Sequence, residues 1–273
     1  MHFLSKKNVQ EFILDVGLGN KYHSPHHLFT FQQLRFLKLQ DCLFHPPLGF
    51  KGFEKLINLA LVRVTFDPSI FTNLISKSPL LERLRLRWCT NFDILEIDAA
   101  NLKFYEFIGE TKSISFKNAP MLEKVSVAFL GLRLLTDTSP VCSNFPKFFH
   151  CMPSLLELNL YGSLLEVADI VEPVVQLLRA QSSSSGAVML QRVQVNMFTG
   201  FEMEMEFMKF ILASAPVLEE VPIWNFTCYL FRSCKQMIDE MKEFRRSSPN
   251  VEFTFEEIEM EGGYEPEEVM EVP

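Results

Sequence analysis

The sequence predicts an α/β solenoid, in which parallel strands stack into a curved sheet on the concave face and return segments pack behind it. Three observations predict this fold: an apolar spacing that recurs along the chain, prolines at a fixed place before it, and helical spacing between the copies. With 273 residues, of which 48% are hydrophobic and 22% charged, the chain is long enough to bury such a core.

The recurring spacing is an apolar residue, two residues of any kind, an apolar residue, one residue of any kind, and a third apolar residue. Eleven copies fit it: Val9, Phe12, Leu14; Leu34, Leu37, Leu39; Leu56, Leu59, Leu61; Leu81, Leu84, Leu86; Phe92, Leu95, Ile97; Leu102, Tyr105, Phe107; Thr111, Ile114, Phe116; Leu122, Val125, Val127; Leu155, Leu158, Leu160; Leu190, Val193, Val195; and Leu218, Val221, Ile223. Residues two apart point to the same side of a strand, so each copy predicts one strand with one buried face.

Prolines and helical segments punctuate these copies. Proline stands two residues before an apolar position at Pro79, Pro120, Pro153, Pro216 and Pro249. Because proline disfavours helix in the residue before it, each proline predicts the end of a helix or loop just ahead of a strand. The stretches PSIFTNLISKSP, MEFMKFILASAP and QMIDEMKEFRRSSP have helical spacing and are predicted to be return helices.

The distance between copies varies, and this variation predicts where helices are missing. Most copies start 22 to 35 residues apart, which leaves room for a helix. Between Phe92 and Leu122 the copies start only 9 to 11 residues apart. We expect the helices there to be missing or replaced by short loops.

The stretch SPLLERLRLRWC places Arg83, Arg85 and Arg87 on the side of a strand opposite Leu84 and Leu86. If the next copy stacks in register, Arg83 lies beside Ile94, Arg85 beside Glu96 and Arg87 beside Asp98. The arginines then form either a cross-strand ladder of charges on a solvated face or a site for an anion or an acidic peptide.

A protein partner that binds the concave face would contact the outward-facing residues of several strands. The candidate partner-binding residues are Arg83, Arg85, Arg87, Glu157, Asn159, Tyr161, Arg192, Gln194 and Asn196. Arginine and tyrosine are frequent interface hot spots, and stacked strands would present these side chains as one strip. Arg83, with the apolar Ile94 beside it, ranks first for partner contact.

The net charge of −8 comes from one end of the chain. Residues 256–273 contain eight glutamates and no lysine or arginine, so residues 1–255 carry 26 acidic and 26 basic residues. A neutral body does not support a general attraction to nucleic acid. We expect the acidic tail to stay solvated and disordered, with partner binding as the alternative.

Cysteine usage and hydropathy indicate an intracellular protein. The six cysteines (Cys42, Cys89, Cys142, Cys151, Cys228 and Cys234) have no regular metal spacing, and we expect them to be reduced and mostly buried. The apolar run LINLALV is interrupted by Asn58 and ends at Arg63, far short of a membrane span. We expect a soluble protein of the cytoplasm or nucleus that binds no membrane.

The sequence resembles plant F-box proteins that carry leucine-rich repeats and a C-terminal FBD domain. The resemblance is carried by LQRVQVNMFTGFEMEMEFMKFILASAPVLEEVPIW with EMKEFRRSSPNVEFTF for the FBD, and by FQQLRFLKLQDCLFHPPLGFKGFEKLINLALVRVTF for the repeats. It implies a leucine-rich-repeat region over residues 1–180 and an FBD domain that continues the solenoid over 187–255. The glutamate-rich residues 256–273 are predicted from their composition to be an acidic tail beyond it.

The same resemblance implies a substrate-recognition part of an SCF-type ubiquitin ligase. These residues show no counterpart of the F-box, the helical module that docks on the Skp-type adaptor, because Met1 already stands just ahead of the first repeat. We therefore expect adaptor binding only in a longer form with an F-box upstream. The alternatives are an interaction scaffold that competes with full-length relatives, and a sensor whose concave basic patch holds a small molecule or anion.

Catalytic and cofactor motifs are missing from the sequence. The HSPHH cluster (His23, His26, His27) has no acidic or cysteine partner at ligand spacing and is interpreted as a polar loop. Cys142, His150 and Cys151 lie among phenylalanines and are interpreted as packing, and SSSSG at 182–186 lacks the lysine of a phosphate-binding loop. We expect no catalytic residues, no metal, no cofactor and no enzymatic activity.

Overall fold

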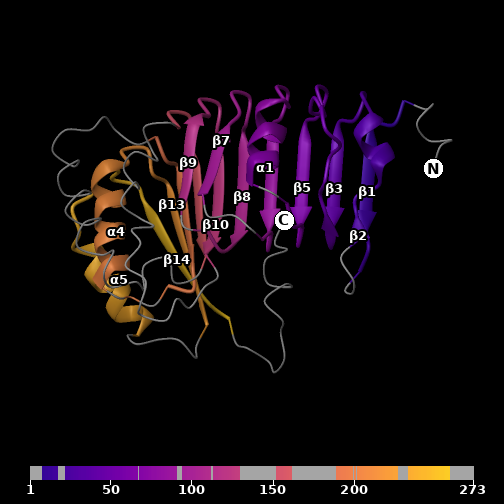
Figure 1. Cartoon of the computed structure of the whole chain (residues 1–273). Helices are drawn as coiled ribbons and strands as arrows, with labels where there is room; N and C mark the ends of the chain where they lie inside the picture. Colours follow the sequence, from indigo (N-terminus) through magenta and orange to yellow (C-terminus); the bar gives the residue numbers. More distant parts are fainter. Residues whose placement is uncertain are drawn as a thin grey trace.

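A parallel sheet of ten strands runs the length of the molecule (Figure 1). The computed structural model describes residues 8–17, 22–66, 68–90, 94–111, 113–129, 152–161, 189–198, 200, 202–226 and 233–258. In spatial order the strands are β1 (Glu11–Asp15), β3 (Phe36–Gln40), β5 (Asn58–Val62), β6 (Arg83–Arg87), β8 (Phe104–Gly109), β10 (Lys124–Phe129), β11 (Glu157–Tyr161), β12 (Arg192–Asn196), β13 (Glu220–Phe226) and β14 (Glu252–Ile258). Spatial order follows chain order, which confirms the predicted solenoid.

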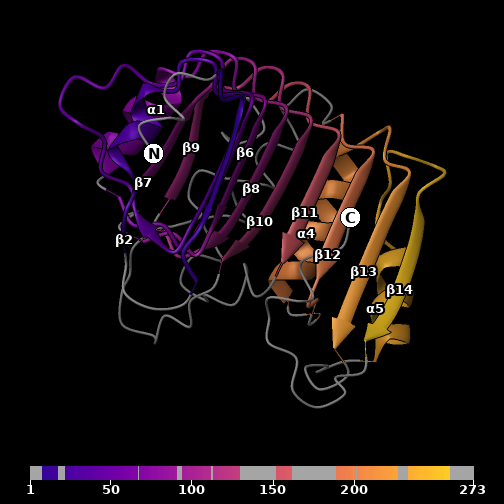
Figure 2. The same ribbon diagram turned by 90° about the vertical axis from the view of Figure 1, so that its right-hand side faces the viewer.

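The remaining elements pack behind this sheet. They are η1 (His26–Thr30), α1 (Pro68–Ser76), α4 (Glu202–Ser214), α5 (Cys234–Lys242), and two small parallel sheets, β2 (Tyr22–His23) with β4 (Cys42–Leu43) and β7 (Ile94–Asp98) with β9 (Ser113–Asn118). Both views place α4 and α5 on one side of the C-terminal strands (Figure 2). The three predicted return helices are confirmed as α1, α4 and α5.

The prolines mark the tight turns through which strands are entered. The Leu81 N–H donates to the Ser78 carbonyl at 3.1 Å across Pro79. The same bond recurs at the Pro120, Pro153 and Pro216 turns: Leu122 to Ala119 at 3.2 Å, Leu155 to Met152 at 3.2 Å, and Leu218 to Ala215 at 3.3 Å. Proline suits the second position of such a turn, because its φ is already fixed there and no N–H is needed.

The core lies between the ten-stranded sheet and the elements behind it. Leu84 and Leu86 of β6 are fully buried, and so are Leu37 and Leu39 two strands away. Burial of each such side chain contributes roughly 1.5–3 kcal/mol before entropy is subtracted. A strand from one repeat cannot close this core alone, so the repeats stabilise one another.

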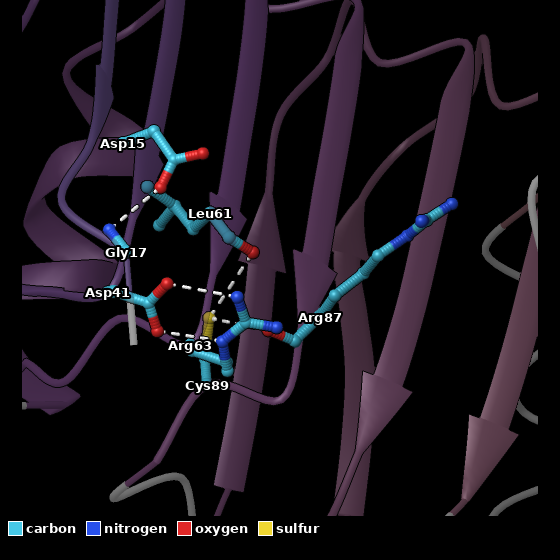
Figure 3. A network of polar contacts seen from close by, with 7 residues as sticks. All are labelled: Asp15, Gly17, Asp41, Leu61, Arg63, Arg87 and Cys89. Carbon is cyan, nitrogen blue, oxygen red and sulfur yellow. Dashed lines mark hydrogen bonds and ion pairs between the residues drawn. The ribbon is translucent and has the colours of Figure 1, made fainter. Parts of the chain in front are cut away.

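Several strands are followed directly by a residue in the left-handed region. Asp41, Arg63, Trp88 and Met197 have φ of 56°, 51°, 51° and 60°. The Arg63 N–H donates to the Arg87 carbonyl of the next strand at 2.8 Å, and its guanidinium binds both oxygens of Asp41 at 2.7 and 2.9 Å (Figure 3). The backbone turns away after each strand without losing its link to the neighbouring strand.

Strands β7 and β9 confirm one prediction and correct another. Residues 94–111 and 113–122 contain no helix, as the short spacing predicted, but these two strands form their own sheet instead of joining the main one. Leu95 and Ile97 of β7 are fully buried, and Tyr105 of β8 meets Phe116 of β9 edge to face at 5.2 Å. These strands therefore close the core from behind, in the place that a helix takes in longer repeats.

The last strand extends past the expected boundary of the acidic tail. β14 pairs with β13 from Glu252 to Ile258, so Glu256 and Glu257 are part of the sheet and not of a disordered tail. Residues 259–273 and the SSSSG stretch lie outside the described residues. The predicted boundaries of the repeat and FBD regions stay predictions.

Candidate protein-binding surface

The ten-stranded sheet has one face turned away from the core, which we call the open face. The strand register places Asn58, Arg83, Phe104 and Lys124 in one row across β5, β6, β8 and β10. A second row contains Ala60, Arg85, Glu106, Ser126 and Asn159, and a third contains Val62, Arg87, Ile108, Ala128 and Tyr161. The three arginines of RLRLR therefore lie on this face, as predicted.

Glu106 is the carboxylate that meets these arginines. The Nε of Arg87 donates to Oε1 of Glu106 at 2.5 Å, and the Nε of Arg85 lies 3.7 Å from Oε2. The Glu106 side chain is only 11% exposed, whereas that of Arg85 is 45% exposed. The Glu106 carboxylate therefore interacts closely with Arg87 and only at longer range with Arg85.

Arg83 lies over an aromatic ring instead of a carboxylate. Its guanidinium carbon is 4.3 Å from the centre of the Phe104 ring, and that of Arg85 is 5.1 Å from the same ring. Burial lowers the pKa of Arg83 most, repulsion from Arg85 lowers it further, and Glu106 partly offsets both. Within the described part of the chain, Arg83 makes no hydrogen bond or ion pair, and its side chain is exposed.

The structure overturns the predicted partners of the arginines. Register puts Arg85 beside Glu106 and Arg83 beside Phe104, because β6 pairs with β8 and not with β7. Glu96 instead binds Lys117 at 2.8 Å in the small sheet, and Asp98 pairs with Asn118 there. The charge ladder from Arg85 to Glu96 and from Arg87 to Asp98 does not exist.

The other candidate residues form a pair of adjacent strands. β11 and β12 align Glu157 with Arg192, Asn159 with Gln194, and Tyr161 with Asn196. Two further strands, β8 and β10, separate this group from β6. The nine predicted residues thus share one face, but they form two groups and not one strip.

Hydrogen bonds bind the β11 and β12 group together. The Asn159 Nδ2 donates to the Ser126 hydroxyl at 3.2 Å, while its Oδ1 is buried without a hydrogen-bond partner among the described residues. Gln194 donates to Asn196 at 3.1 Å, and Asn196 donates to the Leu160 carbonyl at 3.3 Å. Asn159, Gln194 and Asn196 are buried, so this half of the face has a mostly satisfied polar layer, with Glu157, Tyr161 and Arg192 as its partly exposed members.

Ionic contacts at the edge of the same group add to this order. Glu157 binds Lys124 at 2.8 Å, and Arg192 binds Glu220 of β13. Burial raises the pKa of Tyr161, Glu106 raises it further and Arg87 lowers it, so the tyrosine belongs to the field of the arginine cluster across β10. Tyr161 therefore lies near enough to Glu106 and Arg87 for their charges to affect its pKa.

Phe104, Glu106 and Ser126 are open-face residues that the sequence analysis missed. They stand at outward positions of the copies starting at Leu102 and Leu122. The signal that could have found them is the spacing: Leu81, Leu102 and Leu122 are 21 and 20 residues apart, close to the period of the earlier repeats. Leaving out the intermediate copies gives the correct neighbours.

The other candidate chemistries give no site in the described residues. His23 lies in β2, and His26 and His27 begin η1. Across the described ranges, no group of three histidine, cysteine, aspartate or glutamate side chains is gathered as a metal site would require. Cys142, His150 and Cys151 lie outside the described residues.

Two of the cysteines lie buried in the described part of the chain. Cys42 and Cys89 are free thiols in the core. Burial, with a smaller contribution from Asp41, raises the pKa of Cys42 to about 11. None of the described helices has the length and apolarity to cross a membrane.

Comparisons with known proteins agree with this architecture. A family model described as FBD-associated F-box protein At5g56370, LRR repeats, matches residues 1–142, and the FBD model matches residues 189–223. The chain is also 28% identical over 313 residues to the Arabidopsis thaliana protein named F-box/FBD/LRR-repeat protein At1g13570, across 93% of this chain and 74% of that relative. The chain therefore belongs to the plant family of FBD-associated F-box proteins with leucine-rich repeats.

Proposed function

We propose that this chain is the substrate-recognition part of an SCF-type ubiquitin ligase, and that it captures its protein substrate on the open face. The observation that carries the proposal is the exposed guanidinium pair of Arg83 and Arg85 over Phe104, held on a rigid sheet. Arginine on an aromatic platform is a frequent hot-spot chemistry. Family membership supports a protein partner over other ligands.

The open face is suited to recognition because its side chains are fixed before a partner arrives. Arg87 is held by Glu106, Glu157 by Lys124 and Arg192 by Glu220. A partner therefore orders few side chains on binding, which lowers the entropic cost of association. In this proposal Arg83 makes the strongest contact, and the partly exposed Glu157, Tyr161 and Arg192 of the β11 and β12 group make a second, polar one.

The proposal is tested by photo-crosslinking in plant extract. A benzophenone amino acid replaces Ala60 on the open face in one protein and Lys235 on α5 in the control. We expect Ala60 to capture a protein that Lys235 does not, and that protein's ubiquitination to change when the gene for this chain is disrupted. Capture only from α5, or a captured protein with unchanged ubiquitination, contradicts the proposal.

A scaffold that competes with full-length relatives makes a different prediction. In that case the open face captures the same protein, but added chain lowers the ubiquitination of that protein. Pull-down with the Skp-type adaptor separates the two roles further. A ligase component isolated from the cell must bind the adaptor, whereas a competing scaffold need not.

A further inference from the structure

The N-terminal half of the open face has short side chains between two rows of long ones. Strand β5 is the middle strand of three, with β3 on one side and β6 on the other. The long residues are Phe36, Lys38 and Gln40 on β3 and Arg83, Arg85 and Arg87 on β6, and the short ones are Asn58, Ala60 and Val62 on β5. A chain laid along β5 would therefore have long side chains on both sides.

These flanking side chains carry positive charge that the protein leaves largely unneutralised. Arg87 is bound by Glu106, and Arg85 keeps only a 3.7 Å contact with it. Among the described residues, Lys38 and Arg83 make no ion pair or hydrogen bond through their side chains. Repulsion from Arg85 also contributes to the lowered pKa of Arg83, as expected where cations outnumber anions.

The excess of cations is local to this part of the face. The open-face positions of β3, β5, β6 and β8 carry four basic residues and one acidic residue. At the two edges the sign reverses, with Glu11 and Asp15 on β1 and Glu252 and Glu256 on β14. An acidic ligand is therefore attracted to the region around β5 and repelled from both ends of the sheet.

The spacing of the cations selects the conformation of the ligand. Arg83 and Arg85 are two residues apart on a strand, which is about 6.6–6.8 Å. Side chains at alternate positions of an extended ligand repeat at the same distance. Lys38 and Arg85 lie on either side of Ala60, about 9–10 Å apart at the strand-to-strand spacing, which leaves room for one extended chain between them.

We propose that an extended acidic segment of a protein partner, with glutamate or aspartate at alternate positions, lies along β5 between Lys38 on one side and Arg83 and Arg85 on the other. This inference rests on the proposed function and names the chemistry of the substrate segment. The guanidinium groups bind the carboxylates, and the Phe104 ring, 4.3 Å from the Arg83 guanidinium carbon, supports that side chain from below.

The test uses three labelled peptides and the full chain, with binding followed by fluorescence anisotropy. The first peptide has three glutamates at alternate positions separated by serine, the second has the same three glutamates in a block, and the third has glutamine in their place. We expect the alternating peptide to bind at least tenfold more tightly than the glutamine peptide and several-fold more tightly than the block. Equal affinity for all three overturns the proposal.

Variants locate the bound peptide. Arg83→Glu and Lys38→Glu should each weaken binding of the alternating peptide at least tenfold, and raising the salt concentration should weaken it further. The matched control is Arg245→Glu, an exposed arginine after α5, which should leave binding unchanged. If Arg83→Glu does not fold, the milder Arg83→Gln gives the same comparison. Loss of binding in the Arg245 variant alone, or none in the other two, overturns the proposal.

The chain's own acidic C-terminus is the competing occupant. A full-length variant with glutamine at Glu259, Glu261, Glu265, Glu267, Glu268 and Glu271 removes its charge. Unchanged peptide affinity in this variant supports a partner segment. Peptide binding that appears only in this variant assigns the surface to the chain's own tail and overturns the proposal. Failure of every peptide while Ala60 still crosslinks to a ubiquitinated protein would reject this inference and leave the proposed function standing.

Discussion

Arg87 and Glu106 form a short ion pair on neighbouring strands, with the Arg87 Nε 2.5 Å from Oε1 of Glu106. Both side chains are largely buried, and so are Phe104 and Ile108, which flank Glu106 on the same side of β8. The pair fixes one arginine and leaves Arg83 and Arg85 to point outward. The ion pair thus stabilises the sheet. Because it occupies Arg87, it also leaves Arg83 and Arg85 as the arginines available to a partner.

Glu106→Ala should destabilise the protein by about 2–3 kcal/mol, because it leaves the mostly buried Arg87 without its carboxylate. Glu82→Ala is the matched control. Glu82 binds Lys103 at 3.2 Å, but both side chains are about 40% exposed, so we expect a loss below about 1 kcal/mol. Urea unfolding of both variants measures the difference, and equal losses would mean that Arg87 does not depend on Glu106.

Leu84→Asp should be severely destabilising, because it places a carboxylate without a partner in a fully buried position of the core. Arg83→Asp, one residue earlier on the same strand, faces the other way and should change stability by less than about 1 kcal/mol. Thermal unfolding followed by circular dichroism compares the two. A melting temperature unchanged by Leu84→Asp would show that the strand register is wrong.

Tyr105→Phe should stabilise the protein by about 1 kcal/mol. The Tyr105 side chain is fully buried in β8, and its hydroxyl has no hydrogen-bond partner in the described part of the chain. Burial also raises its pKa well above the ordinary value. Removing an unsatisfied hydroxyl removes its desolvation cost. Tyr161→Phe, at a partly exposed position, should give no such gain in urea unfolding; a loss of stability in Tyr105→Phe would reveal a partner for the hydroxyl.

Stability should fall between pH 9 and pH 11 partly because of Cys42. Its pKa is raised from 9.0 to about 11, so the folded protein holds the thiol proton more tightly than the unfolded chain does. This contribution is complete below pH 9 and is lost as the pH rises toward 11, by up to about 2–3 kcal/mol. The measurement is the loss in unfolding free energy between pH 8 and pH 10.5. We expect this loss to be smaller in Cys42→Ala than in the unchanged protein. An identical difference in both proteins would show that Cys42 does not contribute.

The sequence predicted the strands better than it predicted their neighbours. Leu84 and Leu86 are buried as expected, because alternation shows which face of a strand is apolar. Leu95 and Ile97 are buried just as fully, although β7 belongs to the layer behind the main sheet. The apolar spacing reports burial alone, and both layers bury the same kind of side chain.

That limit explains the errors in the candidate surface. The apolar spacing predicts β7 as the neighbour of β6. That incorrect neighbour makes Glu96 and Asp98, instead of Glu106, the expected partners of the arginines. Glu106 is hard to recognise from the sequence. It is a buried glutamate at an outward position, and its role becomes evident only when the arginines of the adjacent strand are known. Pairwise contacts between distant repeats cannot be obtained from one repeat's spacing.

In the proposed function, the open face around Arg83 recognises a protein partner. The most direct test of this function is the affinity of the partner captured at Ala60 for two proteins, Arg83→Glu and the control Arg245→Glu, measured by isothermal titration calorimetry beside their melting temperatures. We expect Arg83→Glu to bind at least tenfold more weakly than the control, with nearly unchanged thermal stability, and to lose more than Arg85→Glu or Arg87→Glu where these variants fold. Equal affinity of the Arg83 and Arg245 variants would contradict the claim and leave the arginines as a solvated strand face.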